Sequence, residues 1–220
     1  MAGEEAIDFL EFSTLEDFLV AHRAVRLDED IASLTERWGG ALSASDLEDA
    51  VESTNFASLE TLSLPTGIPE EFQVRKITIT NYGITFWYLP EHITVSRDTF
   101  WSAISQNPSF QFSISRRQEN EMELILQRDN VNREDLIDGK YLFFYPNMFV
   151  WESDGVMLLL YTPTPSHDAG DETRMVTTEI DGISLDDPYA MVRFTETATL
   201  NLQDTRAVET MIAELEATRR

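Results

Sequence analysis

The sequence predicts an α+β protein in which an antiparallel sheet of hairpins (a β-meander) packs against N-terminal and C-terminal helices. Three observations predict this class. Apolar residues follow a helical period over the first 55 residues, alternate with polar residues from about residue 56, and return to the helical period after residue 203. The strands do not alternate with helices, which argues against a parallel sheet. We therefore expect a helical region at 1–55, an antiparallel sheet domain with short helices at 56–202, and a C-terminal helix at 203–220 packed on the same domain.

Three helices are expected in the first region. Ser13 and Glu16 fit a capping box, in which a hydroxyl caps the helix and a glutamate follows three residues later. An apolar stripe at helical spacing follows, formed by Leu15, Phe18, Leu19, His22 and Val25. A second short helix is expected from residues 28–30 to Trp38, where two glycines stop it. A third helix is expected after the capping pattern that begins at Ser45.

Alternating apolar residues predict the strands of the sheet domain. The expected strands are 59–64, 72–80, 84–89, 110–115, 122–126, 140–145, 148–151, 156–161 and 191–200. Asn81 to Gly83 form a turn, and Ser96 is the expected cap of a short helix that carries Phe100. A single helical turn is expected at 132–135, and Asp204 caps the terminal helix.

Two of these strands are apolar at nearly every position. Asp154-Gly155 lies between strands 148–151 and 156–161, and this dipeptide between two apolar runs is a strong hairpin signal. Strands without polar alternation are typical of positions covered on both faces, so we place this hairpin centrally in the sheet. The following tract, 163–188, is rich in proline, glycine and acidic residues, and we expect loops there with a short strand at 174–178.

The charge of the chain excludes several classes of partner. It has 40 acidic and 16 basic side chains, a formal net charge of -24, and no cysteine. Such a charge opposes binding to nucleic acid and to anionic membranes. The absence of cysteine excludes disulfides and thiol chemistry. No run approaches the ~20 apolar residues that span a bilayer, and residues 1–8 do not look like a signal peptide.

The sequence contains no recognisable catalytic motif, and we assign no catalytic residue and no organic cofactor. Of the three histidines, His22 lies on an apolar stripe and is expected to be buried, His92 lies in a loop, and His167 has serine and aspartate only as chain neighbours. One group of acids lies in a loop, where oxygen ligands suit Ca²⁺. The candidate Ca²⁺ ligands are Asp168, Asp171 and Glu172.

Aromatic residues of the strands are a further candidate site. Exposed rings can stack on sugars or bind a peptide, whereas alternate rings on strands usually face inward, and we expect these mainly in the core. They are Phe86, Trp87, Tyr88, Trp101, Trp151 and Tyr161.

Several phrases between about residues 56 and 200 resemble a group of uncharacterised exported proteins of Gram-positive gut bacteria. The segment from Leu62 to Phe72 is similar to their Tyr-x-Val-Pro-x-x-Ile-Pro-Glu-Gly-Phe phrase, with Glu71 where glycine is common. Residues 74–79, 85–90 and 148–155 also resemble that group. The resemblance implies an extracytoplasmic location and no established activity.

These observations favour a non-enzymatic, extracytoplasmic binding or interaction domain whose partner is a protein or a cell-envelope ligand. One alternative is a hydrolase or carbohydrate-active enzyme that uses carboxylates. The other is a cytoplasmic acidic protein adapted to high salt, in which a dense carboxylate surface holds water and ions. The three alternatives remain open at the level of sequence.

Overall fold

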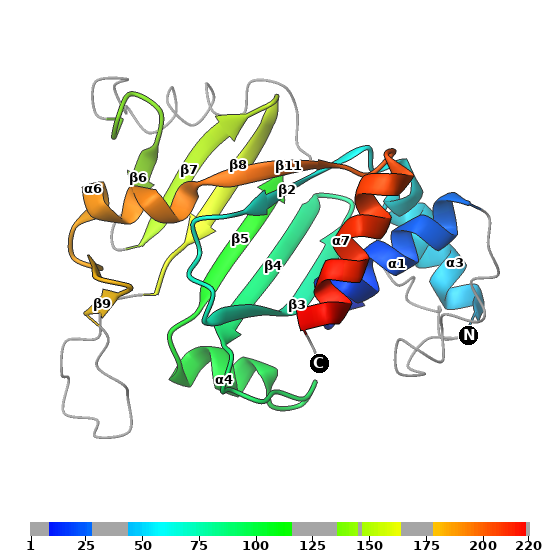
Figure 1. Cartoon of the computed structure of the whole chain (residues 1–220), viewed down its shortest axis with the longest axis horizontal. Coiled ribbons are helices and arrows are strands. Elements are labelled where there is room, and N and C mark those ends of the chain that lie inside the picture. The colour runs from blue at the N-terminus through cyan, green and yellow to red at the C-terminus, as the bar shows by residue number, and fades with distance from the viewer. Residues whose placement is uncertain (1–8, 28–43, 116–135, 145–146, 164–177, 219–220) are drawn as a thin grey trace, which may run out of the picture. The chain divides into compact units, whose positions relative to one another are not determined.

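The protein has an α+β fold, shown in Figure 1 as a computed structural model. The structure describes residues 9–27, 44–115, 136–144, 147–163 and 178–218. In this part, one seven-stranded sheet and two two-stranded sheets are present. The large sheet has the order β1 (Phe9–Phe12), β3 (Phe72–Thr80), β4 (Gly83–Pro90), β5 (Phe110–Ser115), β8 (Val156–Tyr161), β7 (Met148–Ser153) and β6 (Leu142–Phe144). The small sheets pair β2 (Thr61–Pro65) with β11 (Thr197–Asn201), and β9 (Glu179–Ile180) with β10 (Ile183–Ser184).

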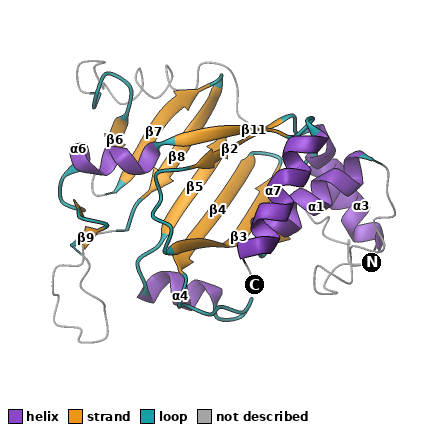
Figure 2. Ribbon diagram, viewed as in Figure 1, coloured by secondary structure: helices purple, strands orange, loops and turns teal. Residues whose placement is uncertain are grey.

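The helices lie at both ends of the chain and between the strands (Figure 2). They are α1 (Leu15–Arg26), α3 (Ala44–Ser53), α4 (Phe100–Gln106), α6 (Pro188–Met191) and α7 (Thr205–Thr218), with short 3₁₀ helices η1 (Phe56–Ser58) and η3 (Val192–Thr195). The predicted first, third and terminal helices are confirmed as α1, α3 and α7. Asp204 caps α7 as predicted, because its Oδ1 accepts from the backbone N–H groups of Arg206 and Ala207 at 3.1 Å.

The chain forms two compact units. Unit 1 comprises residues 1–64, 76–84 and 199–220, and unit 2 comprises residues 65–75 and 85–198. The boundaries between the units therefore fall inside strands β2, β3, β4 and β11.

Aromatic rings form the core of unit 1. Phe12, Phe18 and Phe56 are buried, and their ring centroids lie 5.4–5.6 Å apart. Helix α1 is buried around most of its circumference rather than along one stripe, because its buried residues include the consecutive run from Phe18 to His22. Its cap is Thr14, whose hydroxyl accepts from the Asp17 N–H at 3.1 Å, so the cap lies one residue after the predicted Ser13.

Within the region 1–55, which was predicted to be helical, the structure also contains strand β1. Leu10 pairs with Ile79 and Phe12 with Ile77, and all four side chains are buried. On the opposite side of the pleat, Glu11 forms an ion pair with Lys76. Four residues are too few for the period-2 pattern to stand out beside the helical pattern that follows.

The predicted hairpin at 148–161 is confirmed as β7 and β8. Asp154 and Gly155 both have positive φ, 52° and 77°, which is the geometry of a two-residue type I′ turn. Phe149, Val150 and Trp151 are consecutive and all buried, so both faces of β7 are covered, as expected. The two strands lie inside the sheet, between β5 and β6, although β5 is the middle strand.

Two other sequence predictions are wrong in detail. The predicted strand at 191–200 contains the end of α6, then η3, and only then β11. Asp187 caps α6 and Pro188 takes its first position, a helix signal that outweighs the β-branched residues that follow. Helix α4 begins after Thr99 rather than after Ser96.

The predicted helix at 28–38, the strand at 122–126 and the helical turn at 132–135 lie outside the described residues, as does most of the strand predicted at 174–178. Among the described residues, no helix has both the length and the apolar character needed to cross a bilayer.

Candidate functional site: an acidic groove

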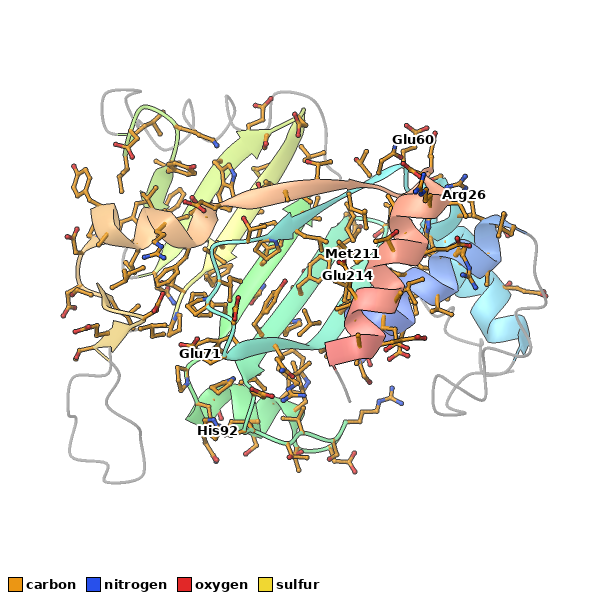
Figure 3. The ribbon with its side chains drawn as sticks, in the orientation of Figure 1. Arg26, Glu60, Glu71, His92, Met211 and Glu214 are labelled. Carbon is orange, nitrogen blue, oxygen red and sulfur yellow. The ribbon has the colours of Figure 1, made fainter. Side chains whose placement is uncertain are left out.

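Unit 2 contains an open groove of ≈ 860 Å³. Its apolar lining comes from Phe72, Pro90, Pro108 and Ile180, and its polar lining from Glu71, Glu91, His92, Thr178, Glu179 and Asp181. Ligand sites in proteins are typically concave and mainly apolar, with a few polar groups that orient the ligand. Figure 3 labels Glu71 and His92, which lie at the end of the sheet next to α4.

Pairing of β3 with β4 brings the first two carboxylates together. Glu71 directly precedes β3 and Glu91 directly follows β4, and the N–H of Glu91 donates to the carbonyl of Glu71 at 2.7 Å. The guanidinium of Arg75 also donates to the carbonyl of Glu91, at 2.6 Å. These two hydrogen bonds, one between backbone groups and one from a side chain to a backbone carbonyl, hold the ends of the strands at one side of the groove.

The hairpin of β9 and β10 supplies the other side. Ile180 pairs with Ile183, and the turn between them is Asp181-Gly182, with φ values of 49° and 73°. The type I′ turn requires positive φ at both positions, which aspartate tolerates and glycine adopts freely. This hairpin lies in the tract 163–188, where we predicted loops, although Asp-Gly between two isoleucines was the signal that could have revealed it.

The floor of the groove is fixed by packed rings. Phe72 is 7% exposed, and its ring meets that of Phe110 edge-to-face at 4.9 Å. Phe110 is fully buried and contacts Phe194 at 5.1 Å. A floor held by such contacts is formed before any ligand arrives.

The rim of the groove is acidic and exposed. Glu71, Glu91, Glu179 and Asp181 are all exposed, and no lysine or arginine is among the described residues that line the groove. Arg193 lies beside it, with its Nη2 3.9 Å from Asp181 Oδ2, but both side chains are more than half exposed and such a pair is weak. The groove therefore favours a cation over an anion.

Comparison with protein-family models, curated proteins and solved structures finds no match to this chain. Its function is therefore inferred from the site.

The predicted Ca²⁺ ligands Asp168, Asp171 and Glu172 lie outside the described residues. Within the described ranges, no group of three histidine, cysteine, aspartate or glutamate side chains is arranged to hold a metal ion. His167 also lies outside those ranges. The acids that line the groove are not among these predicted ligands, whose arrangement stays a prediction.

The buried histidine of unit 1 is His22. It is 1% exposed, its ring lies 5.3 Å from that of Phe56, and its Nε2 has no hydrogen-bond partner among the described residues. The pKa of His22 is lowered to about 4, mainly by burial; a hydrogen bond with the backbone of Leu59 opposes this shift, and the nearby Arg26 adds to it. The ring is therefore neutral at pH 7, as expected for a buried histidine.

The aromatic candidates divide between core and surface. Phe86, Tyr88 and Trp151 are buried, which agrees with the expected core role, and burial raises the pKa of Tyr88. Trp87 is half-buried, whereas Trp101 is 57% and Tyr161 36% exposed. The rings of Trp87 and Trp101 meet edge-to-face at 5.2 Å, beside the buried Phe100.

Proposed function

We propose that the protein is a non-enzymatic, extracytoplasmic binding domain whose ligand occupies the acidic groove of unit 2. The observation that carries the proposal is the combination of a preformed apolar floor with a rim of four carboxylates in one open concavity. The floor supplies contact area, and the rim selects ligands by charge.

A carboxylate-based hydrolase on the same groove is the alternative. Glycoside hydrolysis needs two carboxyl groups in different environments, one of them in an apolar setting that keeps it protonated. All four groove carboxylates belong to exposed residues, which supports binding over hydrolysis. Turnover of chromogenic glycosides, lost on changing Glu71 or Glu91 to glutamine, would establish the alternative.

The resemblance to exported proteins supports the extracytoplasmic location. Brief protease treatment of intact cells that express the full-length gene product tests it, with immunoblotting of this domain as the readout. We expect the protease to digest this domain in intact cells, because we propose that it lies outside the cytoplasm. Protection in intact cells, together with digestion after lysis, would instead support the cytoplasmic alternative.

Ligand binding in the groove can be tested without knowing the ligand. We expect at least one of three probes, a basic peptide, a neutral oligosaccharide or an anionic oligosaccharide, to raise the Tm of the protein saturably. Thr178→Arg places a bulky side chain on the lining and should abolish that shift. Ser105→Arg adds the same charge at an exposed position of α4, and this variant should still show the Tm shift.

Two results would count against the proposal: no shift of the wild-type Tm with any probe, or an unchanged shift in Thr178→Arg.

A further inference from the structure

We infer that the groove binds an extended, lysine- or arginine-rich peptide segment that adds as a strand to the edge of β9. The inference rests on the proposed function and names the class of its ligand.

The first observation concerns the part of β9 that faces the groove. Both residues of β9 and the flanking Thr178 and Asp181 line the groove, although side chains along a strand point alternately to opposite faces. Consecutive residues can line one concavity when the edge of the strand, with its backbone groups, faces that concavity. The hairpin thus presents main chain as well as side chains to a ligand.

The second observation concerns hydrogen bonding along this edge. Ile180 pairs with Ile183 across the two-residue turn, and the N–H of Leu185 donates to the carbonyl of Thr178 at 3.0 Å. Hydrogen-bonded and non-hydrogen-bonded pairs alternate in an antiparallel ladder, so Glu179 is the non-hydrogen-bonded residue between them. Its N–H and C=O consequently point away from β10. Within the described residues β10 is the only strand paired with β9.

The third observation is charge complementarity. The rim carries four carboxylates, and two arginines of the described part of the chain already have partners beside it: Arg75 donates to the carbonyl of Glu91, and Arg193 pairs with Asp181. The net charge of -24 reinforces the attraction of a cation from a distance. The occupant therefore carries positive charge.

The apolar floor refines this choice to lysine and arginine. Their methylene stems lie along apolar surface while the charged heads reach a polar rim. Phe72 and Ile180 are buried floor residues next to the rim acids in sequence, so one such side chain can contact both. A polyamine shares the charge and the stem but lacks the backbone amides that would pair with Glu179.

The decisive experiment measures binding of a fluorescein-labelled seven-residue peptide with lysine at alternate positions, by anisotropy at low and moderate salt. We expect saturable binding that weakens at higher salt. Neutralising the rim (E71Q, E91Q, E179Q and D181N together) should weaken binding at least ~10-fold. The control variant neutralises four exposed acids that do not line the groove (D98N, E152Q, E196Q and E214Q). Both variants change the formal net charge from -24 to -20. The control should bind the peptide at least ~3-fold more tightly than the rim variant.

The strand geometry is tested with the same peptide N-methylated at alternate residues, which keeps every charge but removes the N–H groups on one edge. We expect at least ~10-fold weaker binding for the methylation pattern that blocks the pairing edge, and little change for the other pattern. Equal binding of both methylated peptides, or displacement by spermine at equal charge concentration, would overturn strand addition. Absence of peptide binding would overturn the inference as a whole. Saturable binding of a neutral oligosaccharide that Thr178→Arg abolishes would then show that the proposed function itself still stands.

Discussion

His22 makes the free energy of unfolding depend on pH in a defined window. In the folded protein its pKa is lowered to about 4, whereas in the unfolded chain it returns to its ordinary value of 6.5. Between these values the unfolded state binds more protons, so stability is lost as the pH falls from 6.5 toward 4. We expect His22 to account for a loss of roughly 2–3 kcal/mol between pH 7.5 and 4.5.

The measurement is urea unfolding across that pH range, with two variants. His22→Leu should lose this part of the pH dependence because no titrating ring remains. His92→Gln changes an exposed histidine and should follow the wild-type curve. Parallel curves for wild type and His22→Leu would show that the buried ring does not set the dependence.

Gly67 is required by a close approach of two backbones. A Cβ at this position would lie 2.0 Å from the carbonyl oxygen of Arg193, and the N–H groups of Thr66 and Gly67 both donate to the carbonyl of Glu196. Backbone must move to admit a methyl group, so we expect Gly67→Ala to lower the free energy of unfolding by about 2–3 kcal/mol. Thr66→Ala leaves these backbone bonds in place and is the matched control; equal values for the two variants would contradict the prediction.

At the scale of elements, Arg26 ties the end of α1 to the start of α7. Its guanidinium donates to the carbonyl of Leu202 and, at 3.2 Å, to that of Gln203, immediately before the cap of α7. We expect Arg26→Ala to lower the free energy of unfolding by about 1–2 kcal/mol, since hydrogen bonds to charged groups contribute about this much.

Arg26→Lys supplies the control, because an ammonium is a point charge and does not reproduce the fork of the guanidinium. It should recover only part of the loss. Hydrogen exchange of the α7 amides should accelerate in Arg26→Ala, and unchanged exchange there would show that the contact does not stabilise the helix.

The elements that the sequence predicts well are those with a long, regular period. Helix α7 and the hairpin of β7 and β8 repeat their pattern over many residues and end at recognisable caps or turns. Strand β1 is missed because four residues carry too little pattern, and α6 because the signal from Asp187 and Pro188 competes with β-branched residues. In both cases tertiary contacts or a local cap decide the outcome.

The groove could be predicted less well than the fold. Its acids come from three places in the chain, and only the pairing of β3 with β4 and the hairpin of β9 bring them together. Acidic residues are so frequent here, 40 in 220 residues, that their density in sequence does not single out Glu71 or Glu91. The Asp-Gly dipeptide at Asp181 was the sequence feature that could have indicated the hairpin on one side of the groove.

At the scale of the whole molecule, net charge opposes compactness. With a formal charge of -24, repulsion among carboxylates is relieved as the charges separate on unfolding. Salt screens this repulsion over a Debye length of about 10 Å at 0.1 M. We expect the Tm to rise by several degrees between about 20 and 300 mM NaCl.

Two comparisons check that screening is the cause. KCl at equal ionic strength should raise the Tm as much as NaCl. The variant with D98N, E152Q, E196Q and E214Q carries four fewer negative charges and should show a smaller salt effect. A Tm that does not move with salt would show that self-repulsion does not limit stability.

The two Asp-Gly turns, one joining β7 to β8 and the other joining β9 to β10, also affect which substitutions the protein can tolerate during evolution. In each, the alignment of the two arms is decided by two residues of left-handed backbone rather than by the side chains of the arms. Substitutions at exposed positions of the arms therefore leave the pairing of the two strands in place, whereas the buried residues of β7 and β8 remain constrained by the core. In the hairpin of β9 and β10, substitutions at the exposed Glu179 or Ser184 can therefore change the surface that the hairpin presents without changing its shape.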